Sequence, residues 1–202
     1  MNLPNKLTIL RTILIVPFVI IMLTGCLGVA SNWVALAIFV IASLTDLLDG
    51  KIARKYNLVT NFGKFMDPLA DKLLVCAALI CLMSMDMLPA WAVIVIMSRE
   101  FIISGFRLIA SDNGVVIAAS MWGKFKTVFQ MAMIIALIVI RAFYPSAFWN
   151  NFMLLNPVSM EGFVVKFLTV VGSLLVWIAL ILTVVSLIDY IVKNKNVMKD
   201  TK

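Results

Sequence analysis

The stretch TDLLDGKIARKYNLVTNFGKFMDPLADKLL, residues 45–74, places four aspartates between two strongly apolar segments. They are Asp46, Asp49, Asp67 and Asp71. Ionisable side chains are rare where a chain lies in hydrocarbon, and those that occur there usually carry a function. The meaning of this stretch therefore depends first on whether its flanking segments span a membrane.

The composition is that of a membrane protein. Of the 202 residues, 63% are hydrophobic and 13% are charged, and the mean hydropathy is +1.09. A helix needs about 20 apolar residues to cross a bilayer. Runs of suitable length lie at about 12–27, 32–48, 69–88, 90–110, 122–143 and 163–191. The sequence thus predicts an all-α integral membrane protein with six transmembrane helices, forming a single membrane domain over residues 1–202.

The distribution of Lys and Arg predicts the orientation, because cytoplasmic loops retain basic residues. With the N-terminus inside, most of the net charge of +7 falls on the cytoplasmic side. The basic segments there are 1–11, 51–64, 107–126 and the tail 192–202. The outer segments hold only Arg141 and Lys166. We therefore expect both termini and the aspartate loop to be cytoplasmic.

The chain contains no histidine, which limits its chemistry. Histidine-ligated zinc or copper and histidine-dependent catalytic triads are excluded. Clustered carboxylates favour hard divalent ions, so Mg²⁺ or Mn²⁺ is expected. Nucleic acid is a poor partner for basic residues dispersed among spans. Cys26, Cys76 and Cys81 form no CxxC pair and are interpreted as packing residues.

The aspartates have helical spacing. Residues at i, i+3, i+4 and i+7 share one helix face. This spacing holds for Asp46, Asp49, Gly50 and Ala53. Two carboxylates would be followed there by two residues with almost no side chain, against which a large ligand could lie.

The second half of the stretch repeats the pattern with Gly63, Asp67 and Asp71 at i, i+4 and i+8. Pro68 makes Asp67 either the N-cap of the third span or part of a helix that began earlier. In either case Asp67 and Asp71 share a face.

Two antiparallel spans would bring the four carboxylates together at their cytoplasmic ends. Four like charges at a membrane boundary are costly, and two divalent cations would relieve that cost. Paired metal ions commonly clamp phosphate oxygens, and Arg54 could add a fixed positive charge for such an anion. Any one aspartate could instead be an ordinary solvated interfacial residue. The joint pattern indicates phosphoryl transfer.

The pattern Asp-x₂-Asp-Gly-x₂-Ala-Arg-x₈-Gly-x₃-Asp-x₃-Asp, residues 46–71, resembles without departure the signature of the CDP-alcohol phosphotransferase family. Members displace CMP from a CDP-linked lipid or alcohol with a second alcohol. The resemblance implies a six-span fold, a homodimer and a site open to the cytoplasm. It also implies that the four aspartates bind two Mg²⁺ or Mn²⁺ ions and that Asp71 is the general base. The residues implied to line the CDP pocket are Gly50, Ala53, Arg54 and Gly63.

Two flanking segments are similar to those of one bacterial subfamily, the phosphatidylglycerophosphate synthases. NLPNKLTILR, residues 2–11, looks like its N-terminal amphipathic helix. SREFIISGFRLIASDNGVVIAASMWGKFKTVFQ, residues 98–130, shares its REF, GFR, AAS and GKFKT elements. This resemblance implies CDP-diacylglycerol as donor, glycerol 3-phosphate as acceptor, CMP and phosphatidylglycerophosphate as products, and a place in the bacterial inner membrane.

An acceptor that is a small dianion needs cations of its own. Arg107, Lys124 and Lys126 flank the basic loop between the fourth and fifth spans and are the candidates, although both lysines could equally be anchors of the positive-inside kind. Arg99 and Glu100 lie well inside the fourth span, where they are either functional or a buried ion pair that links two helices.

Two alternatives remain open. The same core motif would serve a different acceptor, such as serine, inositol phosphate or phosphatidylglycerol. Outside the family, a divalent-cation transporter would also place aspartates beside spans, but it would carry them near mid-bilayer on several helices.

Overall fold

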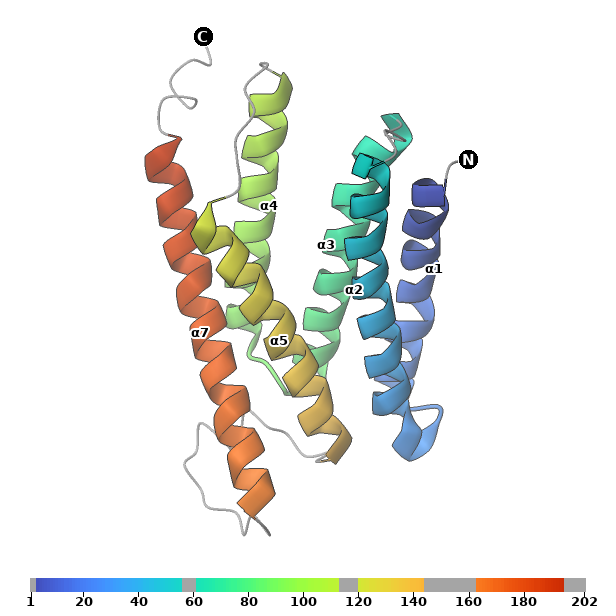
Figure 1. The fold of residues 1–202 in the computed structure, drawn as a ribbon. Helices are drawn as coiled ribbons and strands as arrows, with labels where there is room; N and C mark the ends of the chain where they lie inside the picture. The colour runs from blue at the N-terminus through green and yellow to red at the C-terminus, as the bar shows by residue number, and fades with distance from the viewer. Residues whose placement is uncertain (1–2, 56–60, 113–119, 144–162, 195–202) are drawn as a thin grey trace. The chain divides into compact units, whose positions relative to one another are not determined.

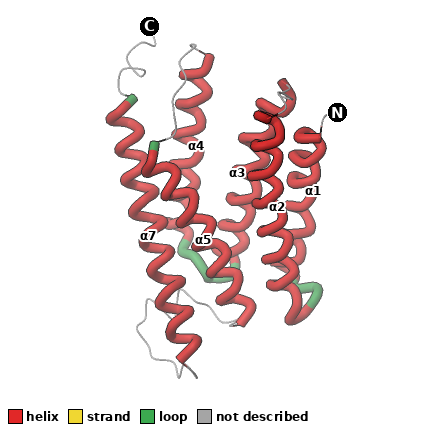
Figure 2. The backbone as a smooth tube through the Cα atoms, viewed as in Figure 1, coloured by secondary structure: helices red, strands yellow, loops and turns green. Residues whose placement is uncertain are grey.

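The computed structural model describes residues 3–55, 61–112, 120–143 and 163–194, with side chains for residues 8–45, 70, 72–110, 120–143 and 167–194. Within these ranges the secondary structure is entirely helical (Figures 1 and 2). The α-helices are α1 (Leu3–Thr24), α2 (Ser31–Lys55), α3 (Asn61–Ser84), α4 (Ala90–Asp112), α5 (Met121–Phe143) and α7 (Phe163–Lys193). One turn of 3₁₀-helix, η1 (Gly28–Ala30), connects α1 to α2. The predicted all-α architecture is confirmed.

The helices agree with the apolar runs except at some of their ends. Helices α1 and α3 stop at Thr24 and Ser84, short of the predicted 27 and 88. Of residues 1–11, expected to include a short amphipathic helix, the described part is continuous with the first apolar run. Helix α1 runs without a break from Leu3 to Thr24, with Pro17 inside it. Helix α2 continues seven residues beyond the predicted end at 48, to Lys55. Helix α3 begins at Asn61, eight residues before the predicted start at 69. The last two extensions make the aspartate motif helical.

By length and composition, three stretches among the described residues are apolar enough to cross a membrane. These are Gly28–Thr45, Met121–Phe143 and Phe167–Lys193. Thr8–Thr24 and Lys72–Ser84 are shorter apolar helices. Large apolar side chains such as Val170, Leu174 and Ile181 on α7 are exposed, as expected of side chains that face lipid. The protein is a membrane protein.

One compact unit comprises Met1–Leu88 and Leu137–Asn150. In it α1 packs against both α2 and α3, and consecutive helices run antiparallel (Figure 1). The rings of Phe18 and Phe39 lie 5.9 Å apart between α1 and α2. Fully buried alanines such as Ala35 and Ala42 allow close helix approach. The antiparallel arrangement places the C-terminal end of α2 beside the N-terminal end of α3.

The second compact unit comprises Pro89–Ala136 and Asn151–Lys202, so the boundary between the units falls within α5. Here α4 packs against α7, and the two helices run parallel (Figure 1). The ring centroids of Trp91, at the start of α4, and Trp177, in the middle of α7, lie 6.2 Å apart. The ring centroids of Phe106 and Tyr190, in the C-terminal turns of α4 and α7, lie 6.4 Å apart. These contacts hold α4 in register with α7.

Candidate active site

The first half of the aspartate motif lies on α2. Asp46, Asp49, Gly50, Ala53 and Arg54 all fall within the uninterrupted helix Ser31–Lys55. The helical register that places the first four on one face is therefore confirmed for the backbone. Their side chains lie outside the described residues.

The second half of the motif lies on α3. Gly63, Asp67 and Asp71 fall within Asn61–Ser84, again in uninterrupted helix. Because this helix begins at Asn61, Asp67 is not its N-cap, and Pro68 is a proline within the helix. Of the two alternatives for Pro68, the one in which the helix began earlier is correct. The side chains of these three residues also lie outside the described set.

The two motif segments lie at one end of their unit. Asp46 and Asp49 are in the last turns of α2, and Asp67 and Asp71 are in the first turns of α3. Since these helices are consecutive and antiparallel, the four backbone positions gather at the end where α1 begins (Figure 1). Convergence of the carboxylates themselves stays a prediction.

The three cations predicted to hold the acceptor have different environments. Arg107 is exposed on α4, and its guanidinium carbon lies 6.0 Å from the ring centroid of Tyr190. This contact can hold Arg107 in place by cation–π attraction. Lys124 is exposed on α5. Lys126 is completely buried, and its ammonium is bound to the carboxylate of Glu100.

The difference between the two lysines has a simple helical cause. Residues two apart on an α-helix point about 200° apart, so Lys124 and Lys126 cannot share a face. Lys126 faces inward from α5 and Lys124 faces outward. The GKFKT element therefore contributes one accessible cation and one buried cation.

Arg99 and Glu100 belong to a buried polar network. Glu100 Oε1 lies 3.6 Å from Arg99 Nη1 and also receives the Lys126 ammonium. Arg99 Nε donates to Ser186 Oγ at 3.0 Å, and Ser186 Oγ donates to the Thr183 carbonyl at 3.0 Å. The network links α4, α5 and α7. An ion pair that joins helices, Glu100 with Lys126, is therefore present, and a functional role for Arg99 and Glu100 stays a prediction.

The space around this network is limited. A Cβ atom placed on Gly123 would lie 3.4 Å from Arg99 Nη2, so the guanidinium packs directly against the α5 backbone. Gln130, one turn beyond Lys126, is also buried. Glycine at position 123 lets α5 approach Arg99 closely.

Some polar residues of the interior were not singled out from the sequence. Arg11 was interpreted only as one of the basic residues on the cytoplasmic side, yet its side chain, on α1, is buried with 1% exposed. Ser186 and Thr183 are small hydroxyls in an apolar helix, where they usually bond their own backbone. No sequence signal distinguishes Ser186 as a partner of Arg99, because that contact joins residues 87 positions apart.

Among residues with described side chains, no group of three or more histidine, cysteine, aspartate or glutamate side chains could hold a metal ion. The four motif aspartates lie outside that set. The donors that they offer are all carboxylate oxygens, carried on helical turns at one end of one unit. That donor set suits Mg²⁺ or Mn²⁺.

Comparison with known proteins identifies the family. The family model described as CDP-alcohol phosphatidyltransferase matches residues 1–185. The chain belongs to the CDP-alcohol phosphatidyltransferase family. Members of this family are generally dependent on divalent metal ions. The all-helical fold agrees with this membership.

Several relatives are similar over most or nearly all of the chain. The chain is 45% identical over 208 residues to the CDP-diacylglycerol–glycerol-3-phosphate 3-phosphatidyltransferase of Bacillus subtilis, covering 98% of this chain and 97% of the relative. It is 38% identical over 189 residues to the enzyme of the same name from Rickettsia typhi, covering 94% of both chains. A probable phosphatidylglycerophosphate synthase from Mycobacterium tuberculosis is 42% identical over 142 residues, covering 69% of this chain and 66% of the relative.

Proposed function

We propose that this protein is a membrane phosphatidyltransferase that converts CDP-diacylglycerol and sn-glycerol 3-phosphate to phosphatidylglycerophosphate and CMP. The observation that carries the proposal is the complete aspartate signature on two consecutive helices. It occurs in a chain that is 45% identical, over 98% of its own length, to the CDP-diacylglycerol–glycerol-3-phosphate 3-phosphatidyltransferase of Bacillus subtilis. The product is the precursor of phosphatidylglycerol and cardiolipin.

The donor is proposed to bind along the motif. Gly50, Ala53 and Gly63 offer a surface with almost no side chains, which suits the close approach of a nucleotide. Arg54 supplies a cation for the diphosphate. Asp46, Asp49, Asp67 and Asp71 would hold two Mg²⁺ or Mn²⁺ ions, as the family and the carboxylate donor set indicate. Bound metal supplies neutralisation of the phosphate charge that develops in the transition state.

The chemistry that the chain itself contributes is proton transfer and positioning. Asp71 is proposed to accept the proton of the primary hydroxyl of glycerol 3-phosphate. The resulting alkoxide oxygen attacks the phosphorus that bears diacylglycerol, and the bond from that phosphorus to the CMP oxygen breaks. CMP leaves with the electron pair of that bond. Phosphatidylglycerophosphate stays in the membrane through its acyl chains.

The acceptor phosphate is proposed to bind Arg107 and Lys124. Both side chains are exposed, and the ring of Tyr190 supports Arg107. Lys126 is the weaker of the three candidates, since its ammonium is buried and neutralised by Glu100. It would contact the acceptor only if that ion pair opened.

The orientation belongs to the same proposal. The excess of Lys and Arg beside the motif favours a cytoplasmic active site with both termini inside, in a bacterial inner membrane. Residues 1–202 are proposed to act as one membrane domain, and the family match over residues 1–185 supports this. A homodimer is expected from the family resemblance.

The testing experiment measures CMP release from CDP-diacylglycerol by the purified protein with Mg²⁺ or Mn²⁺. Glycerol 3-phosphate, serine, inositol phosphate and phosphatidylglycerol are compared as acceptors. Release with glycerol 3-phosphate alone supports the proposal. Release with another acceptor retains the metal site and Asp71 but overturns the acceptor assignment, whereas folded protein that releases no CMP favours a cation transporter.

A further inference from the structure

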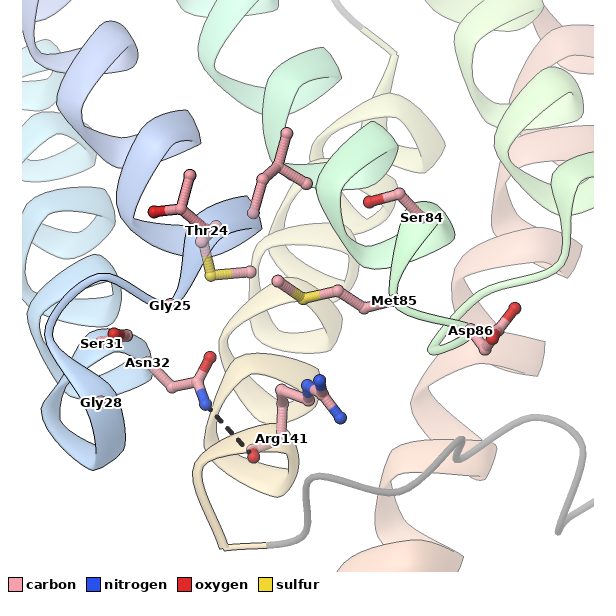
Figure 3. A pocket seen from close by; sticks show the side chains of 11 residues that line it. Thr24, Gly25, Gly28, Ser31, Asn32, Ser84, Met85, Asp86 and Arg141 are labelled. Atoms are coloured by element: carbon pink, nitrogen blue, oxygen red, sulfur yellow. Dashed lines mark hydrogen bonds between the residues drawn. The ribbon is translucent and has the colours of Figure 1, made fainter.

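A polar cavity of about 540 Å³ lies in the unit that carries the aspartate motif. Its walls come from the turn between α1 and α2, the C-terminal end of α3 and Arg141 near the end of α5 (Figure 3). Along α2, Ser31 at the cavity is 15 residues from Asp46, which corresponds to about 22 Å of helix. The cavity is therefore distinct from the proposed active site.

The shape of the cavity depends on two glycines. Gly25 and Gly28 both have φ of +60°, a conformation that other residues rarely adopt. They turn the chain from α1 into η1 at the cavity wall. A Cβ atom at either position would meet nothing within 4 Å, so the glycines are needed for backbone conformation and border open space.

The hydrogen bonds inside the cavity leave a specific set of donors. The Thr24 hydroxyl donates to the Ile20 carbonyl at 2.7 Å, and the Ser84 hydroxyl donates to the Cys81 carbonyl at 2.8 Å. Both hydroxyl protons are therefore used within their own helices. The remaining side-chain donors are the Ser31 hydroxyl, whose oxygen accepts from the Leu27 N–H at 3.0 Å, one Asn32 amide hydrogen and the Arg141 guanidinium.

Arg141 is the main cation of the cavity. Asn32 Nδ2 donates to the Arg141 carbonyl at 3.4 Å, which ties the start of α2 to the end of α5 (Figure 3). The Arg141 guanidinium makes no ion pair with any residue that the structure describes. A planar group with five N–H donors, beside an amide and a hydroxyl, suits the oxygens of a phosphate.

Asp86 supplies the opposite charge at the cavity edge. It adopts φ of 56° after the end of α3, where its N–H donates to the Met83 carbonyl at 3.1 Å. Glycine or asparagine is the usual residue at such a helix end. An aspartate there adds a carboxylate that can accept hydrogen bonds from hydroxyl groups, at a cost in backbone strain.

The surroundings of the cavity indicate lipid. Trp33 follows Asn32 in the chain and Phe143 lies two residues after Arg141; their rings form a T-shaped pair with centroids 5.3 Å apart, and they are 42% and 56% exposed. Exposed aromatic residues at the ends of apolar helices are typical of the level of lipid headgroups. Leu27 and Val29 in the adjoining turn are also exposed, Val29 at 86%. These four exposed residues, the apolar rim, favour a lipid over a soluble anion as the ligand.

We propose that this cavity binds the phosphodiester headgroup of an anionic lipid. Arg141, Asn32 and Ser31 donate to the phosphate oxygens, and Asp86 accepts from the hydroxyl groups of the headgroup alcohol. The exposed apolar side chains of the rim contact the acyl chains. This binding does not depend on the reaction at the aspartate motif.

The test uses Cys26, which is exposed beside the cavity, whereas Cys76 and Cys81 are buried. The full-length protein in detergent is labelled at Cys26 with an environment-sensitive fluorophore, and no CDP-lipid is present. Short-chain phosphatidylglycerol, short-chain phosphatidylcholine, glycerol 3-phosphate and inorganic phosphate are titrated separately. We expect a saturable signal with phosphatidylglycerol at concentrations where the other three have little effect.

Variants connect the signal to the cavity. Arg141→Ala and the nearly isosteric Asn32→Asp should each weaken phosphatidylglycerol binding at least tenfold, and Arg141→Lys should restore part of it. Lys193→Ala removes the same charge from an exposed position on α7 and should change nothing. Helical circular dichroism and size-exclusion chromatography check that each variant is folded.

Three results would overturn the proposal. Unchanged binding in folded Asn32→Asp and Arg141→Ala would show that the signal arises elsewhere. An equal response to phosphatidylcholine would indicate general lipid partitioning. A response to inorganic phosphate at the same concentration would indicate a site for a free anion in place of a lipid.

Discussion

The buried ammonium of Lys126 on α5 is bound to the carboxylate of Glu100 on α4. The side chain of Lys126 is 0% exposed and that of Glu100 is 22% exposed. Arg99 approaches the same carboxylate oxygen and reaches α7 through Ser186. One carboxylate therefore balances two cations at the junction of three helices. Its removal would leave both charges in a poorly solvated place.

Glu100→Gln should consequently destabilise the protein. Removing one member of a buried ion pair typically costs about 3 kcal/mol or more, because the remaining charge is left without compensation. Thermal unfolding in detergent measures the effect. The double variant Glu100→Gln with Lys126→Met should recover much of the loss. If the loss in the double variant equals the sum of the losses in Glu100→Gln and Lys126→Met measured singly, the pair is not coupled.

Asp71→Asn should nearly abolish turnover. An amide cannot accept the proton of the acceptor hydroxyl, and a general base contributes about 10²- to 10⁴-fold to the rate. CDP-lipid binding should be partly retained, since three other aspartates remain. Binding of CDP-diacylglycerol and CMP release are measured on the same preparation. Full activity in this variant would rule out Asp71 as the base.

Arg107→Ala and Lys124→Ala should each raise the KM for glycerol 3-phosphate by roughly tenfold, because each removes a cation proposed to bind the acceptor phosphate. The KM for CDP-diacylglycerol should change much less. Lys193→Ala is the matched control, as Lys193 is an exposed cation paired with Asp189 at 2.6 Å. Equal changes in both KM values would argue against an acceptor site at these residues.

Labelling of Cys26 tests the orientation. Cys26 is exposed in the turn between α1 and α2, while Cys76 and Cys81 are buried in α3. A cytoplasmic aspartate motif places that turn on the outer side of the membrane. A membrane-impermeant maleimide should therefore label Cys26 in intact spheroplasts, and the Cys26→Ser variant should remain unlabelled. Labelling only after permeabilisation would mean that the chain has the opposite orientation.

The same thiol shows where sequence reasoning failed. Cys26, Cys76 and Cys81 all lie in or beside apolar runs, and all three were interpreted as packing residues. This is correct for Cys76 and Cys81 but wrong for Cys26, which is exposed. Helix α1 ends at Thr24, and Gly25 turns the chain away from the packed helices. Hydropathy alone does not show where an apolar run stops being helix.

The helices themselves were largely predictable. A membrane helix must satisfy its backbone hydrogen bonds within one apolar segment, so segment length and composition nearly specify each element. The helical register of the aspartate motif followed from the same periodicity. The extension of α3 back to Asn61 did not, because Pro68 permits a helix both to begin beside it and to pass through it.

Taken by itself, the sequence determined the helical class, the membrane solvent, the register of the four aspartates and the family. These depend on composition and on spacing within single helices, which are local properties. The tertiary structure decided which polar groups meet across helices: Lys126 with Glu100, Arg99 with Ser186, and Asn32 with Arg141 around a cavity. Such contacts join residues 26, 87 and 109 positions apart, and they depend on how helix faces pack.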